Sequence, residues 1–302
     1  MTGIWRAALV ALLITVALSA AAVLGPATAP CPALVAHRGD LWPYSGSTQP
    51  ENSLGAFALA FKVGAPTVKA DLEFSAPGRN GVDPAGGPVI IHDPTVNRTT
   101  LYTGNVNHYS VAALTRMRLL EKTGIPASVT SQTIPSLSMA LAAIKADHGR
   151  VMFELHGVVN AAQMKEVAAK LVQSGAYTSD GSAGPATWVS FNSFVPPDLV
   201  LLRAAVAATG HTLTTQFLAW SYTATVPAGS SMEDVDYRHG IPGSGPPLSA
   251  ANVAAIHAAG MLAGSFAPDL PASNWAALAA KGVDQITTDD PASYVAWCKA
   301  RC

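Results

Sequence analysis

Short apolar runs alternate with longer amphipathic, alanine-rich stretches from residue 33 to the end of the chain. An apolar run of about five residues is typical of a buried strand, whereas apolar positions three and four residues apart indicate a helix with one buried face. The pattern predicts eight strands, at residues 33–37, 67–74, 88–92, 151–156, 187–191, 212–217, 260–266 and 283–287. Helices are predicted between most of them, at residues 53–63, 136–147, 161–174, 196–209, 249–259 and 272–281, with a closing helix at 292–299.

The ends of the predicted helices carry suitable residues. Side chains that can cap a first turn, and prolines that can begin one, precede several helices, namely Asn52, Asn160, Ser249, Pro196 and Pro197. Strand–helix alternation indicates a parallel sheet, and eight repeats in about 270 residues fit a (β/α)8 TIM barrel in the α/β class. An open, doubly wound sheet is the runner-up, but no glycine-rich dinucleotide fingerprint follows the first strand.

Two stretches lie outside the alternation and predict insertions. Residues 93–133 follow the predicted third strand, and residues 219–247, rich in Gly, Pro and Ser, follow the sixth. Long connections inside a domain are usually functional loops or small insertions. In a barrel the loops after the strands build the active site, so both insertions are expected beside it.

Composition narrows the class of protein. The chain has 302 residues, 18 Lys and Arg against 19 Asp and Glu, and a formal net charge of −1. This balance gives no electrostatic reason to expect nucleic acid or an anionic membrane as a partner. With 49% hydrophobic and 12% charged residues, the chain can bury a large core. Residues 30–302 are expected to form one domain.

The first 29 residues are predicted to be a targeting segment. Arg6 is the one charged side chain before an apolar run over residues 7–24, and Ala27, Thr28 and Ala29 supply the small residues that a signal peptidase recognises. The run is also about as long as a short membrane span, so an uncleaved anchor is the alternative. In both cases residues 30–302 are expected to be extracytoplasmic, and a cleaved signal peptide with a secreted product is favoured.

Three cysteines fit an exported protein. Cys31 stands at the start of the predicted domain, and Cys298 and Cys302 stand at its end. A disulfide between the two ends is expected in an oxidising compartment. A helix would hold Cys298 and Cys302 too far apart for an easy bond, so Cys31 is expected to pair with one of them. Cys302 is favoured because a frayed chain end can adjust.

Ionisable side chains collect at the ends of consecutive predicted strands. They are His37 and Arg38 on the first, Lys69, Asp71 and Glu73 on the second, His92 and Asp93 on the third, and Glu154 and His156 on the fourth. Positions 69, 71 and 73 face one way because side chains alternate along a strand. Any one of these residues could be a solvated loop charge or a hydrogen-bonded core residue. Burying so many without a role would cost several kcal/mol, so the set indicates an active site at one rim.

Six short blocks, in order, resemble the glycerophosphodiester phosphodiesterase family. Residues 35–39 (VAHRG) with 50–53 (PENS) resemble its His-Arg-Gly and Pro-Glu-Asn-Thr signature, and residues 90–93 (IIHD) with 97–100 (NRTT) resemble its second histidine block. The other blocks are 134–137 (IPSL), 153–155 (FEL), 190–191 (SF) and 282–289 (GVDQITTD). The resemblance covers nearly all of residues 33–295. The family has a barrel fold, in agreement with the strand count.

The resemblance implies hydrolysis of a phosphodiester, typically a deacylated phospholipid such as glycerophosphocholine, to glycerol 3-phosphate and an alcohol. The expected partner is thus a small molecule, on which the domain is expected to act as a monomer. His37 and His92 match the acid–base pair of the family. The chemistry agrees, because one imidazole of pKa about 6.5 can accept a proton while the other donates one. The nucleophile is either water or a neighbouring substrate hydroxyl. Arg38 is expected to bind phosphate oxygens, and Glu51 and Asp93 to orient a histidine or support the rim. His156 has no partner at a recognisable spacing and is expected to face solvent or cap a backbone group.

The metal site is where the chain departs from the family. The resemblance implies a divalent cation, calcium or magnesium, on a Glu-x-Asp pair and a third carboxylate. Asp71 and Glu154 match, but Lys69 stands at the first ligand position, and an ammonium cannot ligate a metal. The favoured interpretation is a shifted site of Asp71, Glu73 and Glu154. Alternatively, the Lys69 ammonium itself lies near Asp71 and Glu154 and supplies positive charge to the phosphate without a metal.

Two rival functions remain open. One is a phospholipase D-like or cyclising phosphodiesterase that acts on intact or lyso-phospholipid, which aromatic residues within 217–222 keep open. The other is a non-catalytic relative that binds phosphodiesters. Aromatic residues at or after strand ends are expected either to wall the alcohol group or to pack in the core: Phe191, Phe217, Trp220 and Phe266.

Overall fold

The structure, a computed structural model, describes residues 31–40, 49–78, 81–121, 128–157, 159–177, 182–183, 187–236, 248–266 and 272–301. The predicted targeting segment, residues 1–29, lies outside these ranges. Among the described helices, none combines the length and the apolar character that crossing a membrane requires.

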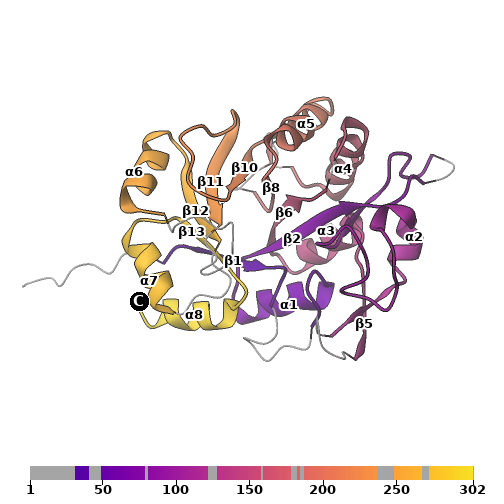
Figure 1. The fold of residues 1–302 in the computed structure, drawn as a ribbon, viewed down its shortest axis with the longest axis horizontal. Coiled ribbons are helices and arrows are strands. Elements are labelled where there is room, and N and C mark those ends of the chain that lie inside the picture. The colour runs from indigo at the N-terminus through magenta and orange to yellow at the C-terminus, as the bar shows by residue number, and fades with distance from the viewer. Residues whose placement is uncertain are drawn as a thin grey trace, which may run out of the picture.

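Within the described residues, eight parallel strands close into a barrel (Figure 1). In chain order they are β1 (Ala33–His37), β2 (Thr67–Phe74), β6 (Arg150–Leu155), β8 (Val189–Ser193), β10 (Thr215–Ala219), β11 (Ser230–Asp236), β12 (Leu262–Phe266) and β13 (Gln285–Thr288). Around the barrel the order is β1-β13-β12-β11-β10-β8-β6-β2, and the pairing of β1 with β2 closes the ring. The predicted eight-stranded α/β barrel is therefore confirmed.

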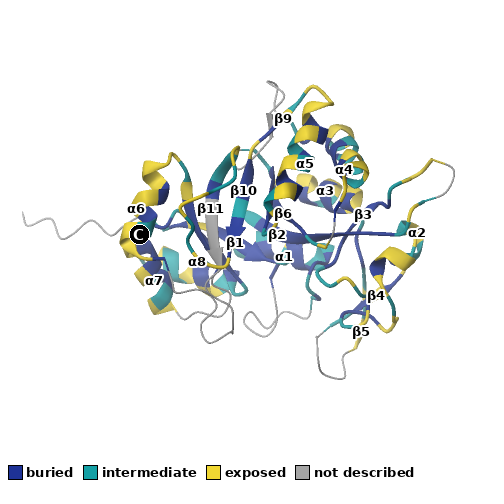
Figure 2. Ribbon diagram, turned by 45° about the horizontal axis from the view of Figure 1, so that its top comes forward, coloured by how far each residue is buried: buried dark blue, intermediate teal, exposed yellow. Residues whose placement is uncertain are grey.

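Helices pack around the outside of the barrel with one face buried against it (Figure 2). They are α1 (Leu54–Val63), α3 (Leu137–Ala146), α4 (Ala161–Ser174), α5 (Pro196–Ala207), α6 (Ala250–Ala258), α7 (Ala272–Ala280) and α8 (Pro291–Lys299). The main core lies between helices and strands, where Phe57, Leu141 and Phe153 are fully buried. Each such side chain contributes roughly 1.5–3 kcal/mol relative to an exposed position.

The helix caps mostly follow the prediction, with one correction. Asn160 and Ser249 cap α4 and α6, and Pro196 opens α5. The cap of α1 is Ser53 rather than Asn52, because Ser53 Oγ accepts the N–H of Ala56 at 3.1 Å. Asn52 takes a positive φ of 57°, and its side chain hydrogen-bonds Asp71 instead.

The predicted third strand does not belong to the barrel. Its residues form β3 (Pro88–Ile90), which pairs antiparallel with the end of β2. It opens an excursion between β2 and α3 that continues through the 3-10 turn Val106–His108, α2 (Val111–Leu114), β4 (Arg118–Leu120) and β5 (Val129–Thr133). The excursion has its own apolar core, which includes Val89, Leu114 and Ile134. The first insertion therefore follows the second barrel strand.

The missing barrel strand lies inside the second predicted insertion. Residues 230–236 form β11, which pairs in parallel with β10 on one side and β12 on the other. The predicted strand at 212–217 divides into a short β9 (Thr212–Leu213), which pairs with β7 (Ser182–Ala183), and the barrel strand β10. The count of eight is unchanged, but the membership of the barrel differs from the prediction.

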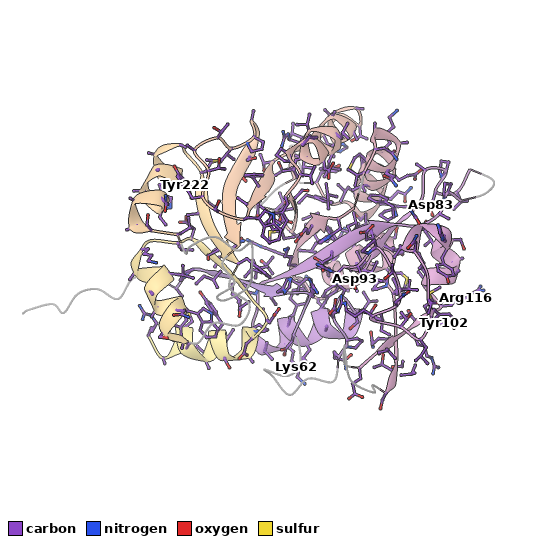
Figure 3. The ribbon with its side chains drawn as sticks, viewed as in Figure 1. Lys62, Asp83, Asp93, Tyr102, Arg116 and Tyr222 are labelled. Atoms are coloured by element: carbon purple, nitrogen blue, oxygen red, sulfur yellow. A yellow bond between two sulfur atoms is a disulfide. The ribbon has the colours of Figure 1, made fainter. Side chains whose placement is uncertain are left out.

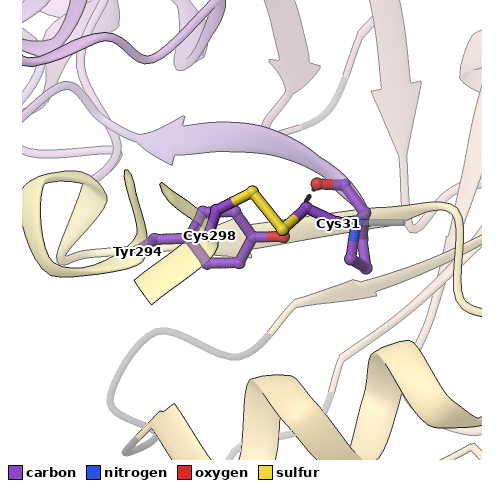
Figure 4. The surroundings of a disulfide bond; sticks show 4 residues. Cys31, Tyr294 and Cys298 are labelled. Carbon is purple, nitrogen blue, oxygen red and sulfur yellow. Dashed lines mark hydrogen bonds between the residues drawn. A yellow bond between two sulfur atoms is a disulfide. The ribbon is translucent and has the colours of Figure 1, made fainter. Parts of the chain in front are cut away.

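A disulfide joins the first strand to the last helix (Figure 4). It links Cys31 to Cys298, whose Cα atoms are 5.9 Å apart. Tyr294 of α8 donates its hydroxyl to Pro32 O at 2.7 Å, and Cys298 lies one helical turn further on the same face. The packing of α8 on the start of β1 thus selects Cys298. The favoured pairing with Cys302, which lies outside the described residues, is wrong.

Candidate active site

Strand register brings the ionisable side chains together at the carboxyl ends of β1, β2 and β6. His37 is the register partner of Lys69, and Asp71 is the register partner of Glu154. Register partners on parallel strands present their side chains to the same face. The predicted convergence of strand ends on one rim is therefore present, and the buried side chains there include His37, Lys69, Asp71 and Glu154.

His37 is held in place by Asp289 and by the ring of Phe266. Its Nδ1 lies 2.5 Å from Asp289 Oδ1, and its ring meets the edge of Phe266 at a centroid distance of 4.5 Å. Burial, together with the charges of Arg38 and Lys69, holds the pKa of His37 well below its usual value. Burial also raises the pKa of Asp289 to about 7. With Nδ1 occupied, Nε2 is the ring nitrogen left for chemistry.

His92 has a comparable partner. Its Nδ1 lies 2.7 Å from Asp93 Oδ1, and Arg98 donates to both oxygens of Asp93 at 2.7 and 2.8 Å. Hydrogen bonding from Arg98 lowers the pKa of Asp93 to about 2. The pKa of His92 is lowered by burial, although Asp71 acts in the opposite direction. In Figure 3 the labelled Asp93 lies nearer the barrel than Tyr102 and Arg116 of the same excursion.

Two arginines share Glu51 and connect the excursion to the barrel. Arg98 donates to both oxygens of Glu51 at 2.7 and 2.8 Å, and Arg38 donates to Glu51 Oε1 at 3.0 Å. The Nε of Arg38 lies 2.9 Å from Asp71 Oδ2. Glu51 and Asp93, predicted as supports of the rim, thus lie in a single network with both arginines.

The turn after β1 is shaped by backbone that most residues avoid. Arg38 has a φ of 56° and Gly39 a φ of 99°, and a Cβ on Gly39 would lie 2.6 Å from Ala56 Cβ. The left-handed conformation and the close approach to α1 together require glycine at position 39. Asn52 lies nearby and clamps Asp71, donating Nδ2 to Oδ2 at 2.8 Å and accepting the Asp71 N–H at 3.1 Å.

Lys69 is buried and forms an ion pair with Glu154. Its ammonium also lies 5.0 Å from the centroid of the Phe266 ring, a cation–π arrangement. Burial would raise the pKa of Glu154, but Lys69 and His156 lower it to about 2. The lysine at the position of the first family carboxylate is therefore an ion-pairing member of the site.

His156 belongs to the site, contrary to the expectation of a solvent-facing or capping role. Its Nε2 lies 2.9 Å from Glu154 Oε1 and 3.4 Å from Asp71 Oδ1, and its ring centroid lies 4.6 Å from that of His92. Burial alone would lower the pKa of His156, but Glu154 and Asp71 raise it to about 10. Alternation along β6 is the signal that could have found it, since residues two apart share a face.

Asp71, His92 and His156 form a group that could hold a metal ion. Their ligand atoms all lie within 4.8 Å of one another. Asp71 Oδ1 and His156 Nε2 are buried without a hydrogen bond of good geometry. Glu73, from the predicted carboxylate set, lies outside this group, and burial raises its pKa to about 7. Two imidazoles and one carboxylate are donors typical of transition metals rather than of calcium or magnesium.

Two of the three carboxylates expected to bind calcium or magnesium each have an oxygen in contact with a cation of the chain. Glu154 Oε2 contacts Lys69, and Asp71 Oδ2 contacts both Arg38 and Asn52. A hard divalent cation takes six or more oxygen ligands, several of them anionic. Glu73 lies outside the candidate metal group, and Asp71 and Glu154 have these partners, so the predicted Asp71, Glu73 and Glu154 site does not fit such an ion.

The expected aromatic residues divide between core and rim. Phe191 is buried in the main core, whereas Phe266 contacts His37 and Lys69. Trp220 stacks on Phe194 with centroids 4.3 Å apart and is 48% exposed, just after the ends of β10 and β8. Phe266 and the Phe194–Trp220 pair therefore form apolar surface beside the ionisable cluster.

The chain matches a known protein family over most of its length. A model of the Glycerophosphoryl diester phosphodiesterase family matches residues 37–293. Among curated proteins, glycerophosphodiester phosphodiesterase 1 of Bos taurus is 31% identical over 123 residues, which is 41% of this chain and 33% of that protein. The Homo sapiens protein of the same name is 29% identical over the same shares. The match thus spans about a third of the length of these curated relatives.

Solved structures share the fold over most of the chain. A glycerophosphodiester phosphodiesterase from Agrobacterium tumefaciens has 21% identity and a TM-score of 0.65, covering 88% of this chain and 99% of its own. An Oleispira antarctica phosphodiesterase in complex with the product sn-glycerol-3-phosphate has 20% identity and a TM-score of 0.64, covering 89% and 97%. At such identities the likeness establishes a common fold.

Proposed function

This chain belongs to the glycerophosphoryl diester phosphodiesterase family, and on that premise we propose that it hydrolyses glycerophosphodiesters to glycerol 3-phosphate and an alcohol. The observation that carries the proposal is a pair of imidazoles at one rim, each with a carboxylate at Nδ1. His37 contacts Asp289 and His92 contacts Asp93. A displacement at phosphorus needs one group to remove a proton and another to supply one, and two such rings meet that need.

His37 is the proposed base and His92 the proposed acid. The lowered pKa of His37, caused first by burial, keeps its ring neutral and able to accept the proton of the attacking O–H. The bond from phosphorus to the leaving alcohol breaks as protonated His92 donates to that oxygen. The pKa of His92 is lowered by burial too, but Asp71 favours its charged form.

The nucleophile is water or a hydroxyl of the glycerol itself. Attack by water gives glycerol 3-phosphate directly, whereas attack by the hydroxyl gives a cyclic phosphate that a second step opens. Mass spectrometry of products formed in ¹⁸O-labelled water, sampled early in the reaction, distinguishes these routes because the cyclic product contains no solvent oxygen.

Arg38 and Lys69 are the proposed source of positive charge for the phosphoryl oxygens. Arg38 contacts Asp71 and Glu51, and Lys69 contacts Glu154, so both cations are positioned before substrate binds. Preorganised charge of this kind stabilises a transition state without reorganisation during the reaction. Calcium or magnesium is the cation that family membership implies, but the carboxylates here do not fit it. Turnover is therefore to be compared in EDTA and with added calcium or magnesium.

An intact or lyso-phospholipid is a second candidate substrate. The half-exposed Trp220 on Phe194 offers an apolar rim surface on which an acyl chain or headgroup could pack. Comparing glycerophosphocholine with lysophosphatidylcholine at equal concentration decides between the two. A higher kcat/KM for the lysolipid, lost in Trp220→Ala, would favour the lipid.

We also propose that the domain works outside the cytoplasm. The Cys31–Cys298 disulfide is of a kind that persists in oxidising compartments. The predicted leader over residues 1–29 agrees with this placement. Fractionation of expressing cells, with N-terminal sequencing of any exported product, tests both the location and the cleavage after Ala29.

The central test is release of glycerol 3-phosphate from glycerophosphocholine and glycerophosphoethanolamine. Replacing His37 or His92 with Ala should lower kcat by roughly 10²- to 10⁴-fold if they are the acid–base pair. His108→Ala, an exposed histidine in the excursion, is the matched control and should keep wild-type turnover. Wild-type rates in either active-site variant would refute the mechanism. Tight binding of substrate without turnover would favour the binding-protein alternative.

A further inference from the structure

The position of Lys69 bears on how this site is charged, and the inference rests on the proposed function. Lys69 is buried on the inner face of β2, two residues before Asp71 and next in register to His37. Its ammonium pairs with Glu154, the carboxylate opposite Asp71 on β6. The lysine therefore lies among the carboxylates that would be expected to ligate a metal ion.

Each of these carboxylates has a cation of the chain as its partner. Glu154 has Lys69, and Asp71 has Arg38 with a further hydrogen bond from Asn52. A hard divalent cation could bind to Glu154 Oε2 and Asp71 Oδ2 only by displacing these partners. Lys69 cannot withdraw into solvent, because it is buried beneath the ring of Phe266. Its charge would repel any ion placed on Glu154.

We propose that the Lys69 ammonium takes the place of the divalent cation, so that the site carries its own positive charge for a phosphodiester and turns over without added metal. Glu154 fixes the ammonium, and Phe266 covers its other side. Arg38, on Asp71, provides the second fixed charge. Together they place two basic side chains at the rim, where a metal ion would supply a double charge.

Calorimetric titration of the full chain with calcium, magnesium and zinc provides a readout independent of turnover. Wild type should show no one-to-one binding tighter than about 1 mM for calcium or magnesium. The zinc titration tests the Asp71, His92 and His156 group as the rival metal site. Lys69→Glu, which supplies a third carboxylate and removes the repelling charge, should gain calcium or magnesium affinity by at least about tenfold. Lys165→Glu, an exposed lysine on α4 given the same charge change, should gain none.

Turnover measured with and without EDTA completes the test. Wild-type kcat should be unchanged by EDTA within about twofold, whereas Lys69→Met, which keeps the length but loses the charge, should lose at least about 100-fold. Lys69→Glu should recover activity only with added metal. Stoichiometric metal binding by wild type, or EDTA inhibition reversed by a cation, would overturn the proposal and leave the phosphodiesterase function standing.

The two levels of the proposal fail separately. Absence of turnover on every phosphodiester, with and without metal, would refute the proposed function, while the titration would still decide what occupies the site. If Lys69→Glu does not fold, as judged by circular dichroism, wild type and Lys69→Met still decide the matter.

Discussion

His37 and Asp289 lie 252 positions apart in the chain, yet His37 Nδ1 and Asp289 Oδ1 are 2.5 Å apart. β1 and β13 pair in parallel with Ala36 opposite Thr288, so the next residue of each strand meets at the rim. The contact therefore follows from barrel closure. A carboxylate at Nδ1 keeps the proton there and leaves the lone pair on Nε2, which makes Asp289 a positioning residue for the base.

Replacing Asp289 with Asn should lower kcat by roughly 10²- to 10⁴-fold and change KM far less, because the ring loses its orientation and preferred tautomer. Burial raises the pKa of Asp289 to about 7, so wild-type kcat/KM should rise as pH increases through about 7 and the carboxyl ionises. That ascending limb should be lost or displaced in the variant. Asp147→Asn, an exposed aspartate after α3, is the control. An unaltered pH profile in Asp289→Asn would contradict the assignment.

Arg98→Gln should reduce kcat by roughly tenfold or more through His92. Arg98 joins Asp93 to Glu51, and without it Asp93 is free to rotate away from His92 Nδ1. The pKa of Asp93, now about 2, should move toward its usual value. Imidazole NMR titration should show a changed pKa for His92. Arg116→Gln, an exposed arginine in the same excursion, should alter neither quantity.

Glu73→Gln should stabilise the fold at alkaline pH. Burial raises the pKa of Glu73 from 4.5 to about 7, so the folded state binds more protons than the unfolded state between these values. Wild-type stability should therefore fall as pH rises from 4.5 to about 7, and the glutamine variant avoids this loss. The expected gain is roughly 1–3 kcal/mol at pH ~8 and close to none below pH ~4.

Urea unfolding at the two pH values, in EDTA, measures this difference. Glu166→Gln on α4 serves as the control and should show no pH-dependent gain. A stability difference between wild type and Glu73→Gln that is equal at both pH values would show that Glu73 is not the titrating group.

Loss of the disulfide should lower the free energy of unfolding by about 2–5 kcal/mol, since the bond closes a very long loop. Cys298→Ser removes the bond between residues separated by 267 positions, and thermal unfolding should show a lower Tm. Cys302→Ser should leave Tm unchanged. A crosslinked peptide that contains Cys302 in a non-reduced digest would reverse the assignment.

Local pattern was sufficient for much of the fold. β1, β2 and α4 have the predicted bounds because their apolar periodicity and caps agree with the packing. β11 was missed because its sequence, SSMEDVD, is polar and acidic and lacks the apolar run of a buried strand. β3 has such a run, but pairing direction depends on its partner and is not encoded locally.

The site was predictable where chemistry lies in a short block and less so where it depends on register. His37, His92, Asp71 and Lys69 follow from strand ends. Asp289 becomes a partner of His37 only when β13 closes against β1. His156 shares a face with Glu154 at the end of β6, but its contact with Asp71 depends on the pairing of β6 with β2. The contact of Lys69 with Glu154, expected in the metal-free alternative, follows from the pairing of β2 with β6.

The bond between Cys31 and Cys298 makes the described chain a closed loop as far as connectivity is concerned, with Cα atoms 5.9 Å apart at the join. A short peptide linker could replace the bond, and the chain could be opened instead at the exposed turn at Gly210, between α5 and β9. Such a circular permutant would keep every strand neighbour of the barrel. The first and last strands of the barrel, which bring His37 and Asp289 together at the rim, would then belong to one continuous stretch of chain.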